Sequence, residues 1–166
     1  DEPQFGSAEH WSGGTPECVP MIQWCDQLPI AFQQKKGYDL VETLPALFHQ
    51  VGPQTSQFRY DFYDVQSDLL AENYFGRIED WCHEHGVLSS LLFHVMFSGS
   101  MMKNWARMDL PGVDLLRASP YKTMAGWERG QFPVPEDFSC KMASSVAHLT
   151  GKQGVFTESF AWANKV

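Results

Sequence analysis

The stretch that decides the fold is residues 87–97, VLSSLLFHVMF. Apart from two serines and one histidine it is wholly apolar, which is typical of a parallel-sheet strand that is buried on both faces. It follows a pattern over residues 55–85 in which apolar side chains recur every three or four positions, as on one face of a helix. Gly86 is placed to end that helix and Gly76 to interrupt it. The sequence therefore predicts a long helix that leads into a buried strand.

Shorter patterns on both sides alternate between helix and strand. Further helices are expected over residues 26–36, 41–50, 99–105 and 139–149, further strands over 113–116 and 153–157, and a loop over 119–135. Such alternation predicts an α/β fold with a parallel sheet. A closed eight-stranded barrel needs roughly 200 residues or more. The 166 residues of this chain can hold about half of one.

Composition excludes several classes of function. Twelve Lys and Arg against 20 Asp and Glu give a formal charge of −8, which argues against a nucleic-acid partner. The sequence contains no run of about 18 apolar residues, so it predicts no membrane span. Nucleotide-binding glycine motifs and the serine-hydrolase motif are absent. The chain starts at Asp1 without a Met or a signal-peptide pattern, so we expect a mature chain or a piece of a longer one.

One cluster carries candidate metal ligands, Cys82-His83-Glu84-His85. His83 and His85 are two positions apart and therefore point to different sides of a helix. Histidines in a last helical turn also complement the helix dipole. A zinc or redox protein is thus the weaker alternative, and no metal or cofactor is predicted. The sequence is compatible both with disulfides and with free thiols at its four cysteines, which are Cys18, Cys25, Cys82 and Cys140.

Acidic residues at strand ends are the candidate catalytic groups. Glu158 follows an apolar strand pattern, and Asp1 and Glu2 have the character of another strand end. Two carboxylates that converge from different strands suffice for glycoside hydrolysis. We therefore predict Glu158 and Glu2 as the catalytic acids, and Asp1, His94 and Asp109 as substrate contacts. Each residue also has a structural alternative. The acids would cap helices, His94 would be buried with its hydrogen bond satisfied, and Asp109 would be a turn residue.

A series of short motifs runs in order along most of the chain. It includes Asp1-Glu2-Pro3, Gly37-Tyr38-Asp39-Leu40, Arg59-Tyr60-Asp61-Phe62-Tyr63, Trp81-Cys82-His83-Glu84-His85-Gly86, Met108-Asp109-Leu110-Pro111-Gly112-Val113-Asp114 and Thr157-Glu158-Ser159-Phe160. This series resembles bacterial glycoside hydrolases related to family 106, the α-L-rhamnosidase type. The chain departs from that pattern before Ser98, where similar sequences have two acids and this one has Met96 and Phe97.

The resemblance implies a catalytic (β/α)8 barrel that is larger than this chain. Residues 1–166 would form one partial barrel domain, completed by the remainder of a longer parent. Its substrate would be a carbohydrate, cleaved with inversion at the Glu158 and Glu2 positions, and similar enzymes can require calcium. The alternative is a non-catalytic barrel fragment that binds sugar or a protein through Trp11, Trp105 and Trp127. The compartment stays open, with a periplasmic or extracellular location compatible with the resemblance.

Overall fold

The computed structural model describes residues 22–93, 100–115 and 136–159. Its elements in order are α2 (Gln27–Lys36), α3 (Leu40–Phe48), α4 (Thr55–Leu70), the π-helix η1 (Ala71–Gly76), α5 (Arg77–Glu84), β1 (Ser90–Phe93), α6 (Met101–Ala106), β2 (Leu110–Leu115), α7 (Glu136–Leu149) and β3 (Phe156–Ser159). The predicted order of helices and strands is confirmed. The expected loop over 119–135 lies outside the described residues.

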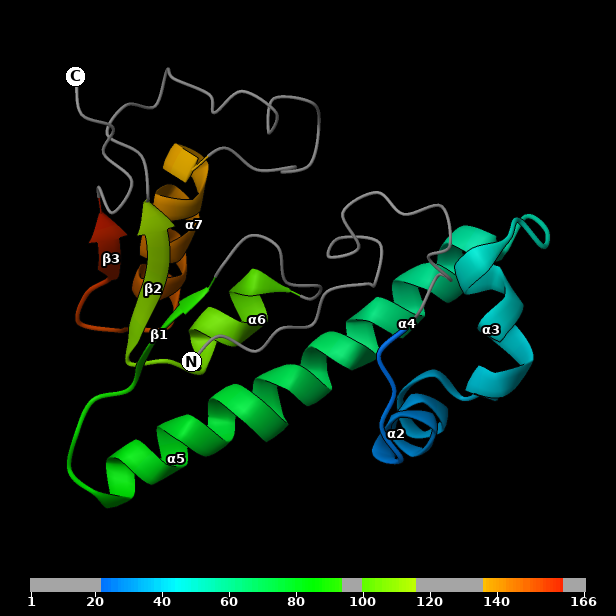
Figure 1. Cartoon of the computed structure of the whole chain (residues 1–166), viewed down its shortest axis with the longest axis horizontal. Coiled ribbons are helices and arrows are strands. Elements are labelled where there is room, and N and C mark those ends of the chain that lie inside the picture. The colour runs from blue at the N-terminus through cyan, green and yellow to red at the C-terminus, as the bar shows by residue number, and fades with distance from the viewer. Residues whose placement is uncertain (1–21, 94–99, 116–135, 160–166) are drawn as a thin grey trace, which may run out of the picture.

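The three strands form one parallel sheet in the order β1-β2-β3. Helices α6 and α7 pack against β2, the central strand, and against each other (Figure 1). The predicted α/β class with a parallel sheet is confirmed. Within the described residues the sheet is open at β1 and β3, so these three strands do not by themselves close a barrel.

A long helical rod made of α4, η1 and α5 crosses the molecule (Figure 1). Its π-helical turn ends at Gly76, so the predicted interruption takes the form of a change in helical winding. A Cβ at Gly76 would lie 2.6 Å from the Arg107 guanidinium, so the flexible Arg107 side chain would have to shift to make room for it. The glycine therefore leaves room for the Arg107 guanidinium against the rod.

Two apolar clusters hold the rod to its neighbours. One joins α2 and α3 to α4 and contains Leu28, Phe32, Leu40, Phe62 and Val65. The other joins η1, α6, β2 and α7 and contains Leu70, Phe75, Trp105, Met108, Val113, Ala143 and Val146. The helical layer and the sheet layer thus each have their own core, and the rod passes through both.

Trp105 of α6 is the largest fully buried side chain of the described residues, with 1% of its surface exposed. Its indole N–H donates a hydrogen bond of 2.8 Å to the Gly112 carbonyl oxygen. A Cβ at Gly112 would lie 2.6 Å from the Leu91 carbonyl oxygen, so only glycine fits here between β1 and β2. Because its ring is shielded, Trp105 cannot form the predicted sugar-stacking surface. Trp11 and Trp127 lie outside the described residues.

A row of aspartates on α4 carries an ion-pair network. Asp61, Asp64 and Asp68 lie on one face of the helix and accept from lysines of α2 and α6. The Nζ–Oδ distances are 3.0 Å for Lys36–Asp61, 2.7 Å for Lys36–Asp64, 2.6 Å for Lys103–Asp64, 2.6 Å for Lys103–Asp68 and 2.6 Å for Lys35–Asp68. The network therefore ties both of those helices to the rod.

Acid is expected to weaken this network at Asp64. Hydrogen bonds from Lys103 and then Lys36 lower the pKa of Asp64 from 3.8 to about 2. Between these two values the folded chain binds fewer protons than the unfolded chain. Its free energy of unfolding therefore falls as pH drops from about 4 to about 2, by at most about 2 kcal/mol from this group.

The Asp64→Asn variant tests that expectation by urea unfolding at neutral pH and at about pH 3. We expect it to be less stable than the parent at neutral pH and to lose less stability on acidification. Asp80→Asn on α5 is the matched control, because Asp80 is exposed and makes no ion pair within the described part of the chain. An acid response of Asp64→Asn equal to that of the parent would contradict the assignment.

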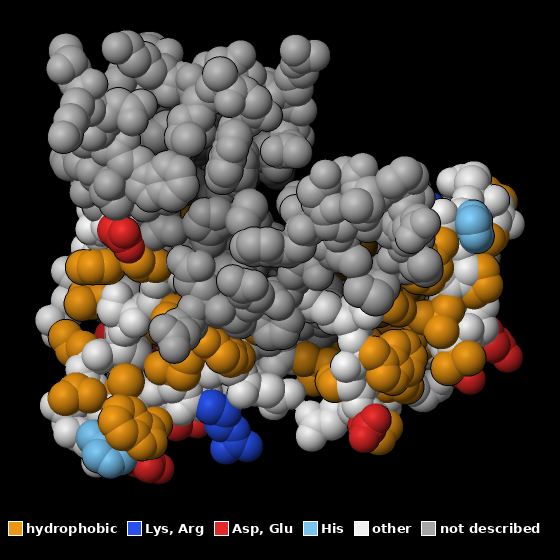
Figure 2. Space-filling view, in the orientation of Figure 1, with side chains coloured by type: hydrophobic (Ala, Val, Ile, Leu, Met, Phe, Trp, Pro, Cys, Tyr) orange, Lys and Arg blue, Asp and Glu red, His pale blue; other side chains and the backbone are white. Residues whose placement is uncertain are grey.

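Large apolar side chains are exposed on the described surface, and Figure 2 shows them over both ends of the face in view. Near the sheet they are Trp81, Val87, Leu88, Val155 and Phe156. Together with the edges of β1 and β3, which no other described strand pairs with, they favour association between copies. We expect the 166-residue chain to self-associate in light scattering at micromolar concentration. A monodisperse monomer would overturn that expectation.

Candidate active site

The carboxyl ends of β2 and β3 form one edge of the sheet, where active sites of parallel α/β folds are built (Figure 1). Glu158 is the penultimate residue of β3, and its side chain is exposed. Its register partner on β2 is Asp114. The structure thus places the predicted catalytic glutamate at a strand end that is accessible to solvent.

The other predicted residues of this site are not brought to that edge by the described structure. Asp1, Glu2 and His94 lie outside the described residues. Asp109 immediately precedes β2 and lies at the opposite, amino-terminal edge of the sheet. At about 3.3 Å per residue, the five positions between Asp109 and Asp114 span about 16 Å.

At that opposite edge, Asp109 is held by Ser89, the residue before β1. The Asp109 Oδ2 atom accepts from the Ser89 backbone N–H at 2.8 Å and from its hydroxyl at 2.9 Å. The Ser89 hydroxyl in turn accepts from the Asp109 backbone N–H at 3.0 Å. These reciprocal bonds fasten the starts of the two strands together.

The imidazole of His83, on α5, also contacts the Asp109 carboxylate. Its Nε2 lies 2.9 Å from Asp109 Oδ2 and 3.1 Å from Oδ1. Partial burial raises the pKa of Asp109, but the Ser89 and His83 contacts outweigh burial and hold that pKa below its usual value. The carboxylate is therefore the stable form at neutral pH.

Glu79 is the residue that the sequence reasoning missed at this edge. It is buried, and its donor atom and those of His83 and Asp109 all lie within 4.8 Å of one another. Glu79 and His83 are four positions apart on α5, which is the spacing of neighbours on one helical face. That i, i+4 spacing was the signal present in the sequence.

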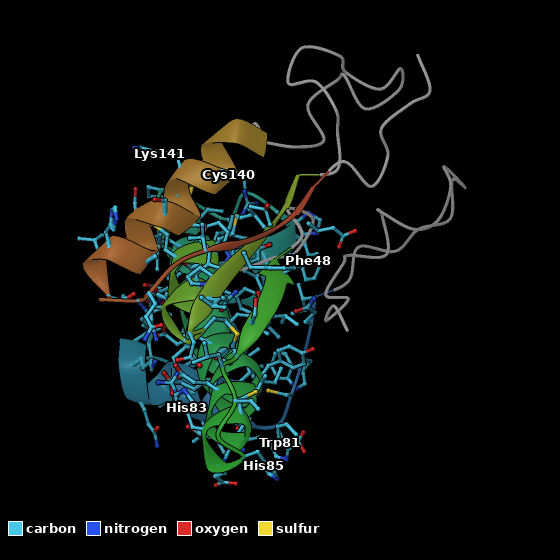
Figure 3. The ribbon with its side chains drawn as sticks, turned by 90° about the vertical axis from the view of Figure 1, so that its left-hand side faces the viewer. Phe48, Trp81, His83, His85, Cys140 and Lys141 are labelled. Atoms are coloured by element: carbon cyan, nitrogen blue, oxygen red, sulfur yellow. The ribbon has the colours of Figure 1, made fainter. Side chains whose placement is uncertain are left out.

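In the Cys82-His83-Glu84-His85 segment, the two histidines point to different sides of α5, as their spacing predicts. His85 stacks on Trp81 with ring centroids 4.1 Å apart, while His83 faces Asp109. Figure 3 shows Trp81 with His85 at the end of α5 and His83 on another side of the helix. Among the described cysteines, Cys25, Cys82 and Cys140 form no disulfide. Cys18 lies outside the described residues.

Comparison with known proteins decides the family. The sequence profile of glycoside hydrolase family 106, described as alpha-L-rhamnosidase, matches residues 18–166. The chain belongs to glycoside hydrolase family 106. The resemblance seen in the motifs is thereby confirmed, and Glu158 is an exposed carboxylate at a strand end of a family 106 chain.

Two similar proteins are much longer than this chain. A protein from Formosa agariphila, provisionally named a beta-glucuronidase, is 31% identical over 145 residues, which are 86% of this chain and 11% of that protein. The solved structure of a rhamnosidase from Novosphingobium sp. PP1Y is 28% identical and superposes with a TM-score of 0.61. That match covers 86% of this chain and 13% of the rhamnosidase. This family 106 chain therefore spans about a tenth of the length of these relatives.

None of the described helices combines the length and the apolar character that a membrane crossing requires.

Proposed function

We propose that this chain supplies part of the catalytic (β/α)8 barrel of a glycosidase that hydrolyses α-L-rhamnosides. The observation that carries the proposal is the placement of Glu158, an exposed carboxylate at the carboxyl edge of a parallel sheet in a family 106 chain. Active sites of (β/α)8 barrels are built at this edge. The similarity to a rhamnosidase over 86% of the chain supports the substrate class.

In this proposal Glu158 is one of two carboxylates that act on the glycosidic bond. One protonates the leaving oxygen, and the other activates a water on the opposite face of the sugar ring, which inverts the anomeric centre. We place the second carboxylate at the Glu2 position, so that Glu158 and Glu2 share these two roles, with Asp1 and His94 as substrate contacts.

Asp109 is left out of the proposed substrate site for a geometric reason. The two carboxylates of an inverting glycosidase lie about 6.5–9.5 Å apart, so residues that touch the reacting bond cluster within a short distance. The start of β2 is about 16 Å from its end. The contacts of Asp109 with Ser89 and His83 instead explain it as a residue that holds α5, β1 and β2 together.

The experiment uses the longer polypeptide that contains this sequence, because the chain spans only 13% of the solved rhamnosidase. We expect it to hydrolyse 4-nitrophenyl α-L-rhamnopyranoside and to release the anomer of opposite configuration, observed by proton NMR early in the reaction. The matching β-D-glucuronide is the comparison substrate, chosen from the provisional name of the Formosa relative. Faster glucuronide cleavage would overturn the substrate class, and rhamnoside binding without cleavage would overturn the catalytic role.

A further inference from the structure

The strongest unassigned feature of the molecule is the meeting of Glu79, His83 and Asp109 at the amino-terminal edge of the sheet. One nitrogen donor and two carboxylates come from two separate elements, α5 and the residue before β2. Their donor atoms all lie within 4.8 Å of one another. A metal with bonds of about 2.0–2.2 Å needs donors somewhat more than 3 Å apart, so small side-chain movements suffice.

The three donors differ in how firmly they are held. Asp109 is oriented by the Ser89 backbone N–H and hydroxyl, which leaves the carboxylate aimed at His83. Hydrogen bonds of this kind orient metal ligands in established sites. The His83 side chain is 52% exposed, so His83 is the most exposed of the three residues. Zinc binds the neutral ring at Nε2, and the proton of that nitrogen then moves to Nδ1 or to water.

Two cations next to Glu79 oppose a metal at this position. Lys152 Nζ lies 3.3 Å from Glu79 Oε1, and Arg107 Nε lies 3.7 Å from Oε2. The second distance is too long for a hydrogen bond, and Arg107 Nε has no hydrogen-bond partner although it is buried. Turning Oε2 toward a metal therefore breaks this long ion pair with Arg107, while Oε1 keeps its ion pair with Lys152.

We propose that Glu79, His83 and Asp109 form a zinc site that joins the end of α5 to the start of β2. A histidine nitrogen with carboxylate oxygens is a donor set that suits Zn²⁺, and water would complete four-coordination. Calcium is not the expected ion, because it selects sites made of oxygen ligands alone. The site lies about one strand length from Glu158, so its role is structural and is independent of the proposed hydrolysis.

The test is a calorimetric titration of the metal-free 166-residue chain with ZnCl₂ at about pH 7.5. We expect one equivalent to bind. Loss of an orienting partner alone costs 10–100-fold in affinity, so removal of the exposed ligand in His83→Ala is expected to weaken binding by at least about 100-fold. His85→Ala is the matched control, because it removes the neighbouring exposed histidine, which stacks on Trp81, and should leave binding unchanged.

Two further measurements separate this site from adventitious binding. Lys152→Gln removes an opposing charge beside Glu79 and is expected to tighten zinc binding. Cobalt in place of zinc should give the visible spectrum of a four-coordinate ion without a thiolate charge-transfer band, which excludes Cys82 as a ligand. Absence of a stoichiometric site, equal binding by His83→Ala and the parent, or weaker binding by Lys152→Gln would each overturn the proposal.

Discussion

Replacement of Glu158 by Gln is expected to lower kcat for rhamnoside hydrolysis by about 10²- to 10⁴-fold, the usual contribution of a general acid or base. The amide has nearly the shape of the carboxylate but cannot exchange a proton with the leaving oxygen or with water. Because the Glu158 side chain is exposed, its replacement should change the free energy of unfolding by no more than about 0.5 kcal/mol. The change thus separates catalysis from folding.

The measurement is kcat and KM of the longer polypeptide with and without Glu158→Gln, together with its thermal unfolding. Glu84→Gln is the matched control: Glu84 is also exposed, but it ends α5 near the opposite edge of the sheet. We expect the control to retain full activity. A Glu158→Gln variant that keeps the kcat of the control would remove Glu158 from the catalytic pair and leave the zinc proposal untouched.

Truncation of Trp105 to Ala is expected to reduce the free energy of unfolding by about 3–5 kcal/mol. The indole is buried between the rod, β2 and α7, so its removal opens a cavity at the junction of the two layers. The hydrogen bond from its N–H to the Gly112 carbonyl is also lost, which adds about 1 kcal/mol. A loss of this size is a large part of the stability of a domain of this length.

Urea unfolding followed by circular dichroism measures the effect. Trp81→Ala is the control with the same change of side chain, and since 58% of Trp81 is exposed we expect a loss below about 1 kcal/mol. Trp105→Phe keeps an aromatic ring but not the N–H donor, so it should fall between the parent and Trp105→Ala and remain measurable if the alanine variant does not fold. Equal losses at Trp105 and Trp81 would show that Trp105 is not central to the core.

The helices were largely predictable because their signals are local. Helix α2 ends at Lys36 as expected, and the next residue, Gly37, adopts a φ of 82°, a left-handed conformation that glycine reaches without strain. The side chain of Asp26, the residue before α2, makes no capping hydrogen bond. Gly76 correctly indicated an interruption in the long helix. Each of these signals depends on neighbours within one or two turns of the chain.

The strand β2 was predicted too short for a tertiary reason. Pro111 and Gly112 suggested a turn before a strand at 113–116, whereas the strand is Leu110–Leu115. Gly112 lies in the strand because it pairs with Leu92 of β1, and only glycine fits there since a Cβ would collide with the Leu91 carbonyl oxygen. Turn propensity is a local preference, and the pairing with β1 overrides it.

The sequence by itself determined the α/β class, the family and the strand-end position of Glu158, since periodicity and ordered motifs are properties of the chain alone. Only the tertiary structure decided that Trp105 is buried and that Asp109 meets Ser89, His83 and Glu79 at the edge opposite Glu158. The physical reason is distance along the chain. Asp109 is 26 residues from His83, and no local pattern encodes a contact that forms only when a helix and a strand pack against each other.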